Sequence, residues 1–267
     1  MALDRSLSRR FIKALSEECS RQKKHLKVPG YPRPYYISYL LRDVRTVQLW
    51  GRLGNLNQVV DTQARSVYSD VRVGSYRFDQ VTEGGLDDND PDTESCEHME
   101  MPIGNDADAL KYHLWKLTDS RYREAVRLYL RKKSQHITYV DPNSDLPSFK
   151  RMPARQVLDF EPFEAIDKAY WRDYIERSSR IVKRFPEVKN SWVDFRVRDV
   201  TRLFVNTEGS QIIDQTRVCD LSCDLWLLTE KGEGVATRVI MATPELGTLP
   251  DLKTFIAKIK ERIRLLQ

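Results

Sequence analysis

Histidine is scarce in this sequence. Four histidines occur among 267 residues, at positions 25, 98, 113 and 136. No two of them stand one helical turn apart, which is the spacing that lets a helix present two imidazoles to one zinc ion. The chain therefore contains no zinc-hydrolase motif of the helical kind.

Glycine-rich phosphate motifs are also absent. The sequence has neither Gly-x-x-x-x-Gly-Lys-Ser/Thr nor Gly-x-Gly-x-x-Gly, which place backbone N–H groups around phosphates. The Gly-x-Ser-x-Gly turn of serine hydrolases does not occur either. These absences exclude the common nucleotide-binding loops and the usual serine-nucleophile turn.

Long hydrophobic runs are missing. Apolar stretches such as Tyr35 to Leu41 fall far short of the ~20 residues that span a bilayer. The first residues, Met1 to Arg5, are already charged and do not resemble a secretory signal. Four cysteines without such a signal are typical of reduced thiols. We expect a cytoplasmic protein without a membrane segment, disulfides or redox chemistry.

Charge is unevenly distributed along the chain. The segment 83–108 contains ten acidic residues and no lysine or arginine. Because the whole chain has a net charge of +5, the remainder carries +15. Glycine, asparagine and proline in the same segment are typical of a long exposed loop. We therefore predict an acidic loop at 83–108 within a basic protein.

Hydrophobic periodicity predicts helices and strands in turn. Apolar residues at helical spacing predict amphipathic helices over 3–26, 106–135, 162–185 and 250–266. Aromatic and β-branched residues with partial alternation predict strands over 35–50 and 67–78, and again from Trp192. Gly51 and Gly54-Asn55 supply the turn between the first two strands.

Two segments of the chain resemble each other. Arg42-Asp43-Val44 is echoed by Arg198-Asp199-Val200, and Asp61-Thr62-Gln63 before Arg65 resembles Asp214-Gln215-Thr216-Arg217. Each copy follows an amphipathic helix, although chance similarity is the alternative. We predict an α+β fold built from a duplicated helix plus antiparallel β-meander, with mixed sheets backed by amphipathic helices. The two units are residues 1–158, which hold the acidic loop and a basic helix, and residues 159–267, which end in the C-terminal helix.

Few residues suggest catalysis. Cys96-Glu97-His98 brings two kinds of metal ligand together, but a solvated acidic loop explains it better. Cys219 and Cys223 share one face of a predicted strand about 13 Å apart, so they are better explained as core thiols. Asp43 and Asp199, at matching points of the repeats, could form a carboxylate pair for a hydrolase. The favoured interpretation of both is an exposed or arginine-paired residue.

One predicted helix carries a basic face. Six cations lie between Arg121 and Lys133, as a phosphate-binding surface would require. No nucleic-acid-binding motif accompanies them. A solvated face, or a docking surface for the acidic loop, is therefore favoured over a nucleic-acid-binding accessory domain.

Three strand segments resemble a known family. Tyr35 to Tyr39, Asp70 to Asp79, and Phe204 to Gly209 are similar to the N-terminal region of the TldD/PmbA family, in the same order along the chain. The resemblance covers most of the chain from about Tyr35. Members of this family are zinc metallopeptidases, also described as modulators of DNA gyrase, which act on unfolded peptides and work as dimers.

The resemblance implies a non-catalytic half of such an enzyme. In the family a His-Glu-x-x-x-His helix in the C-terminal region binds the zinc, and this chain has no such motif. We therefore carry over no catalytic, metal-binding or cofactor-binding residue, and the zinc belongs to the missing C-terminal domain. The implied partners are a C-terminal peptidase domain or a TldD/PmbA-like subunit, and unfolded peptide. The other hypotheses are the nucleic-acid- or protein-binding accessory domain and the carboxylate-dependent hydrolase.

Overall fold

The computed structural model describes residues 3–81, 98–138, 147–228 and 232–265. Its helices are α1 (Arg5–His25), α2 (Ala107–Thr138), α3 (Lys168–Arg180) and α4 (Leu252–Arg264), with short 3-10 turns η1 (Ile181–Arg184) and η2 (Leu246–Thr248). Its strands are β1 (Pro34–Arg52), β2 (Asn55–Val73), β3 (His98–Glu100), β4 (Gln156–Val157), β5 (Val188–Asn206), β6 (Gln211–Leu228) and β7 (Gly234–Thr243).

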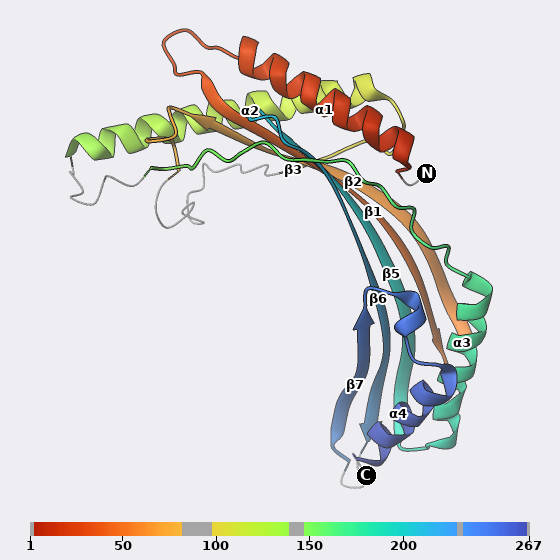
Figure 1. The fold of residues 1–267 in the computed structure, drawn as a ribbon. Coiled ribbons are helices and arrows are strands. Elements are labelled where there is room, and N and C mark those ends of the chain that lie inside the picture. Colours follow the sequence, from red (N-terminus) through yellow and green to blue (C-terminus); the bar gives the residue numbers. More distant parts are fainter. Residues whose placement is uncertain (1–2, 82–97, 139–146, 229–231, 266–267) are drawn as a thin grey trace. The chain divides into compact units, whose positions relative to one another are not determined.

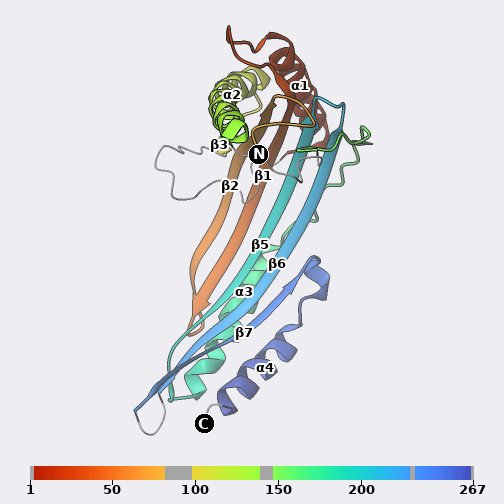
Figure 2. The ribbon, with the colours of Figure 1, turned by 90° about the vertical axis from the view of Figure 1, so that its left-hand side faces the viewer.

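The described strands form one sheet. Its order is β3-β2-β1-β5-β6-β4, and β7 also pairs with β6. β7 runs antiparallel to β6, whereas the short β4 is parallel to β6. Figure 2 shows β2, β1, β5, β6 and β7 in this sequence across the sheet. The predicted α+β fold is confirmed.

A tight turn joins β1 to β2. Only Leu53 and Gly54 separate the two strands, and both have positive φ angles, 52° and 83°. Two such residues are typical of a type I′ turn, whose twist matches that of the flanking strands. Glycine adopts this conformation without strain, but leucine does not. The backbone N–H of Gly54 also donates to Ser179 Oγ at 3.0 Å.

The chain divides into two compact units, which interleave along the sequence. Unit 1 contains residues 1–43, 64–161 and 201–214, and unit 2 contains residues 44–63, 162–200 and 215–267. Each of the long strands β1, β2, β5 and β6 contributes to both units. The sequential division at residue 158 rests on the repeat and stays a prediction.

In unit 1, α1 and α2 lie side by side against one face of the sheet (Figure 1). α1 begins at an N-cap, where the Asp4 carboxylate accepts a hydrogen bond from the backbone N–H of Leu7 at 2.7 Å. Alternate residues of β1 and β2 point at the helices, because side chains of a strand alternate between its faces. The fully buried side chains of this core include Phe11, Leu15, Ile37, Tyr39, Leu41, Leu114 and Leu117.

In unit 2, α3 and α4 cover one face of the sheet in the same way. Asp167 caps α3 by accepting from the backbone N–H groups of Ala169 and Tyr170, each at 3.0 Å. Trp171 of α3 stacks on Phe195 of β5 with ring centroids 3.7 Å apart. Further buried members of this core are Val47, Leu49, Ile175, Val193, Leu221, Phe255, Ile259 and Ile263.

The predicted helices and strands lie at about the right positions in the sequence, but several differ in length from the observed elements. The helix predicted at 162–185 was wrong at its start, because residues 162–166 have no regular secondary structure and α3 begins after the Asp167 cap. At its other end α3 continues into η1. The strand predicted over 67–78 ends at Val73 and begins at Asn55, directly after the turn. The segment 35–50 forms one long strand, β1. Most of the predicted acidic loop, residues 83–97, lies outside the described residues.

Hydropathy rules out a membrane helix in this part of the protein. Across the described ranges, none of the helices combines the length and apolar character that crossing a bilayer requires.

The turn predicts a stabilising substitution. Leu53→Asn should raise the free energy of unfolding by about 1 kcal/mol, because asparagine tolerates positive φ better than leucine does. Gly54→Ala should lower it, because a Cβ there meets the Arg180 side chain at 2.9 Å and the φ angle is unfavourable. Urea denaturation of both variants and wild type measures the two opposite shifts. Equal stability of all three would contradict the assigned turn.

Candidate functional site

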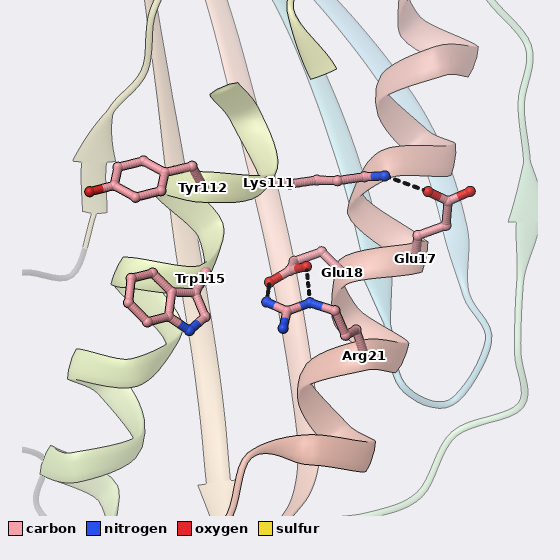
Figure 3. Close-up of a pocket in the computed structure, with 6 residues that line it drawn as sticks. All are labelled: Glu17, Glu18, Arg21, Lys111, Tyr112 and Trp115. Atoms are coloured by element: carbon pink, nitrogen blue, oxygen red, sulfur yellow. Dashed lines mark hydrogen bonds and ion pairs between the residues drawn. The ribbon is translucent and has the colours of Figure 1, made fainter. Parts of the chain in front are cut away.

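An open groove lies between α1 and α2 in unit 1. Its volume is about 540 Å³. Six side chains line it: Glu17, Glu18, Arg21, Lys111, Tyr112 and Trp115. Figure 3 shows the first three on α1 and the last three on α2, on opposite sides of the groove.

Ion pairs form the α1 side of the groove. Arg21 donates to both carboxylate oxygens of Glu18, through Nε at 2.7 Å and a terminal nitrogen at 2.5 Å. Gln22 adds a third hydrogen bond to the same buried carboxylate at 2.7 Å. Lys111 reaches across from α2 to Glu17 at 2.7 Å, and this hydrogen bond lowers the pKa of Glu17. The charges of the groove are therefore paired.

Aromatic rings form the α2 side. Tyr112 and Trp115 are 59% and 46% exposed, with ring centroids 6.1 Å apart. Three residues apart on a helix, they occupy neighbouring positions on its outer surface. The lining contains no cysteine, serine or histidine that could act as a nucleophile or base. This arrangement can bind an apolar or planar group by stacking.

Asp43 and Asp199, the candidates for acid–base catalysis, form buried ion pairs. In unit 1, Arg65 Nε donates to Asp43 Oδ2 at 2.8 Å. In unit 2, Arg217 donates to both oxygens of Asp199, at 2.6 and 2.8 Å. Each carboxylate is therefore occupied by charge-assisted hydrogen bonds to a guanidinium. The arginine-paired interpretation is thus the one that the geometry supports.

The two arginines have matching surroundings. Arg65 donates to the backbone carbonyls of Pro102 and Gly104, and its guanidinium lies 5.1 Å from the Phe11 ring centroid. Arg217 donates to the carbonyl of Glu164 and lies 5.2 Å from the Phe163 ring. Each arginine therefore connects the sheet to the segment that packs over it, which is a structural role.

The described cysteines are core residues. Cys19, Cys219 and Cys223 are free thiols with almost no exposure. Burial raises the pKa of Cys219 to about 11 and those of Cys19 and Cys223 to about 12. Since the thiolate is the reactive form, these residues are poor nucleophiles and ligands at neutral pH.

The donors in the described ranges do not fit a metal. His98, in β3, stacks on Tyr68 with ring centroids 5.2 Å apart. Its neighbours Cys96 and Glu97 lie outside the described residues. Among the residues that are described, no three histidine, cysteine or acidic side chains converge to hold an ion. The zinc implied by the resemblance thus has no ligand set in the described part of this chain.

Two of the six cations on the basic face of α2 pair with acidic residues of the same helix. Arg121 bonds to Glu124 at 2.6 Å and Arg123 to Asp119 at 2.9 Å, both along the helix. Lys132 donates to the backbone carbonyl of Val81, and its ammonium lies 4.8 Å from the Phe78 ring. These contacts fit the interpretation of a solvated helix face with local pairing.

Sequence reasoning missed the groove. Tyr112 and Trp115 interrupt the polar face of the helix predicted at 106–135. These two exposed aromatic residues were the sequence feature that could have indicated the groove. Which surface of α1 faces them depends on how the two helices pack, and local sequence does not encode this.

The buried ion pairs predict unequal sensitivity to charge removal. Asp43→Asn and Asp199→Asn should each lower the free energy of unfolding by about 3 kcal/mol, because each leaves a buried arginine unpaired. Asp214→Asn is the matched control, because Asp214 pairs with Arg202 at the surface and should change stability by less than about 1 kcal/mol. Chemical denaturation measures all three. Equal losses would contradict the assigned structural role.

Comparison with known proteins identifies the fold. No protein-family model and no curated protein matches the sequence. Three solved structures are similar: TldE from Thermococcus kodakarensis (8% identity, TM-score 0.47), a candidate modulator of DNA gyrase from Thermotoga maritima (11%, 0.47) and another from Bacteroides thetaiotaomicron (10%, 0.53). They cover 92%, 92% and 95% of this chain, and 46%, 46% and 48% of their own.

The chain thus spans about half the length of each of these proteins. The Bacteroides similarity extends over nearly the whole chain at a TM-score above 0.5. In fold, this chain resembles one half of a TldD/PmbA-type protein, as its strand segments predicted.

Proposed function

We propose that this chain is a non-catalytic domain of the TldD/PmbA type, which supports peptide binding and dimer assembly for a peptidase domain outside this chain. The observation that carries the proposal is the Bacteroides similarity, which covers 95% of this chain and only 48% of the other. Zinc, in this proposal, belongs to the other domain, and the assembly works in the cytoplasm.

The edge of the sheet at β7 supports the peptide-binding part. Among the described residues, β6 is the strand that pairs with β7, from Gly234 to Thr243. Its sequence, Gly-Val-Ala-Thr-Arg-Val-Ile-Met-Ala-Thr, holds one charge and no proline, so it lacks the usual devices that protect an edge strand. An extended peptide can add to such an edge by main-chain hydrogen bonds, which accept many sequences.

The matching ion pairs support a duplicated origin of the domain, which is also part of the proposal. Asp43 and Asp199 occupy the same position in the echoed Arg-Asp-Val segments. Asp43 pairs with Arg65 and Asp199 with Arg217. The two arginines also occupy matching positions, at the ends of the second pair of similar segments, Asp61 to Arg65 and Asp214 to Arg217. In both units the arginine also lies over a phenylalanine ring. The similarity of the two units therefore extends beyond the short similar segments of sequence.

The first test is enzymatic. The purified chain should not hydrolyse a fluorogenic unfolded peptide, with or without added zinc, because the domain carries no catalytic group in this proposal. Mass spectrometry of the peptide after long incubation measures this. Turnover that a chelator abolishes and zinc restores would refute the proposal.

The second test locates the peptide. Ala236 and Thr237 are adjacent in β7, so their backbone N–H groups point to opposite edges of the strand. Proline has no backbone N–H. Of the variants Ala236→Pro and Thr237→Pro, one therefore removes a hydrogen bond to β6, and the other removes an N–H that points away from β6 at the open edge. We expect the outward variant to weaken binding of a labelled unfolded peptide about tenfold while it keeps wild-type thermal stability.

The other proline variant is the matched control. It should unfold at a lower temperature because it breaks the β6–β7 ladder. Fluorescence anisotropy of the peptide and circular dichroism of the chain separate the two effects. If both variants bind the peptide like wild type, the β7 edge is not the binding site.

A further inference from the structure

A small cavity lies in unit 1 beside Arg65, where the chain enters α2. Its volume is about 20 Å³, which is room for one water molecule or one monatomic ion. Its wall is mostly apolar and includes Phe11 of α1 and Leu110 of α2. The charged side chains of its wall are Arg65 of β2 and Asp106, the residue just before α2.

Arg65 has one unused group of donors at this cavity. Its Nε donates to Asp43 at 2.8 Å, and its Nη1 donates to the carbonyls of Pro102 at 3.1 Å and Gly104 at 2.8 Å. These bonds use every N–H of Nε and Nη1. Nη2 is buried without a hydrogen-bond partner, and the side chain as a whole is 0% exposed. Because burying an unpaired donor is unfavourable, an acceptor beside Nη2 would stabilise the fold.

The matching arginine of unit 2 uses the corresponding group. Arg217 donates from both Nε and Nη2 to the carboxylate of Asp199, at 2.6 and 2.8 Å. Its Nη2 also reaches the carbonyl of Glu164 at 2.8 Å. Arg65 instead reaches Asp43 through Nε, which leaves Nη2 to the cavity. The two arginines occupy matching positions in the sequence, so this difference lies in how each guanidinium is turned.

The N-terminus of α2 forms a second wall of the cavity. This helix begins at Ala107, and Ala109 and Leu110 of its first turn line the cavity. The first N–H groups of a helix have no carbonyl partner within the helix, and the helix dipole makes this end positive. An anion is favoured at such a position. A buried guanidinium nitrogen and a helix N-terminus thus adjoin the same small space.

The charges around the cavity also favour an anion. Arg65 and Asp43 neutralise each other. Asp106 is exposed, so water screens its charge, and it accepts a hydrogen bond from the backbone N–H of Asp108 at 2.8 Å. Arg10 of α1 donates to the carbonyl of Asn105, which places a second guanidinium next to Asp106 along the chain. With the partial positive charge of the helix end, the balance is weakly positive.

Size and hydrogen bonding select a monatomic anion as the occupant. A carboxylate or phosphate group has at least three heavy atoms and is too large for about 20 Å³. A water molecule fits, but it also needs acceptors for its own two protons. The carbonyls of Pro102 and Gly104 already accept from Arg65 Nη1. A halide only accepts hydrogen bonds, as Nη2 requires.

We propose that this cavity binds one monatomic anion of the chloride type, held by Arg65 Nη2 and the N-terminus of α2. The ion accepts the N–H groups that the protein leaves unpaired. It thereby connects β2, which carries Arg65, to the first turn of α2. Because it binds the folded chain and not the unfolded one, it stabilises the fold. This ion site goes beyond the proposed peptide-binding function and does not depend on it.

Crystals of the full chain soaked in sodium bromide test the position of the site. Bromide replaces chloride and scatters X-rays anomalously. An anomalous peak should appear within hydrogen-bond distance of Arg65 Nη2. A peak there without anomalous signal would be a water molecule, and that result would overturn the proposal. So would the absence of any peak.

Thermal unfolding tests whether the ion stabilises the protein. In sodium chloride the wild-type chain should unfold about 3 °C higher than in sodium gluconate of equal ionic strength, because gluconate is too large for the cavity. Ala109→Leu should remove this difference, because the larger side chain fills the cavity that Ala109 lines. Ala257→Leu is the matched control, the same substitution at an exposed position of α4, and should keep the difference.

Two results of the unfolding experiment would overturn the proposal. One is an equal unfolding temperature of the wild type in the two salts, and the other is a difference that Ala109→Leu retains. A bromide peak without the difference in unfolding temperature would mean an adventitious ion only, which also refutes a stabilising site. If Ala109→Leu does not fold, the wild-type bromide crystals and the two-salt comparison decide.

Discussion

The alternation of side chains between the two faces of the long strands is the constraint on which the rest of this structure depends. A strand of nineteen residues such as β1 or β5 points every second side chain to the same face. One face of each unit is therefore apolar and must be covered, and two amphipathic helices cover it in each. The other face of unit 2 keeps exposed rings such as Trp192 and Trp226 and the ion pair between Arg198 and Asp220. Both cores follow from this single periodicity.

The polar groups of the interior serve packing rather than chemistry. Asp43 and Asp199 looked like acid–base candidates, but each holds an arginine that also reaches backbone carbonyls of the covering segments. A buried charge is tolerated only when it is paired and hydrogen-bonded, so these pairs fix how the segments lie on the sheet. The buried thiols, whose pKa values are raised, are equally inert.

Local sequence patterns correctly predicted the elements that depend on residues close together in the sequence. α1 and α4 were found from apolar residues at helical spacing, and the turn after β1 from Gly54-Asn55. The start of the third helix was misplaced, because the Asp167 cap competes with Pro162 as a start signal and only backbone geometry shows which one caps the helix. The short β3 and β4 were not foreseen, because two or three residues carry no periodicity.

The sequence by itself determined the α+β class, the positions of the main helices and strands, the fold resemblance, and the two echoed Arg-Asp-Val segments, because each is written in local spacing or in residue identity. Only the tertiary structure decided what those segments do and which surfaces remain open. Whether Asp43 meets Arg65, whether Trp115 of α2 faces Glu18 of α1, and whether Trp226 stays uncovered all depend on contacts between residues distant in sequence. Such contacts are set by packing of whole faces, and no local pattern encodes them.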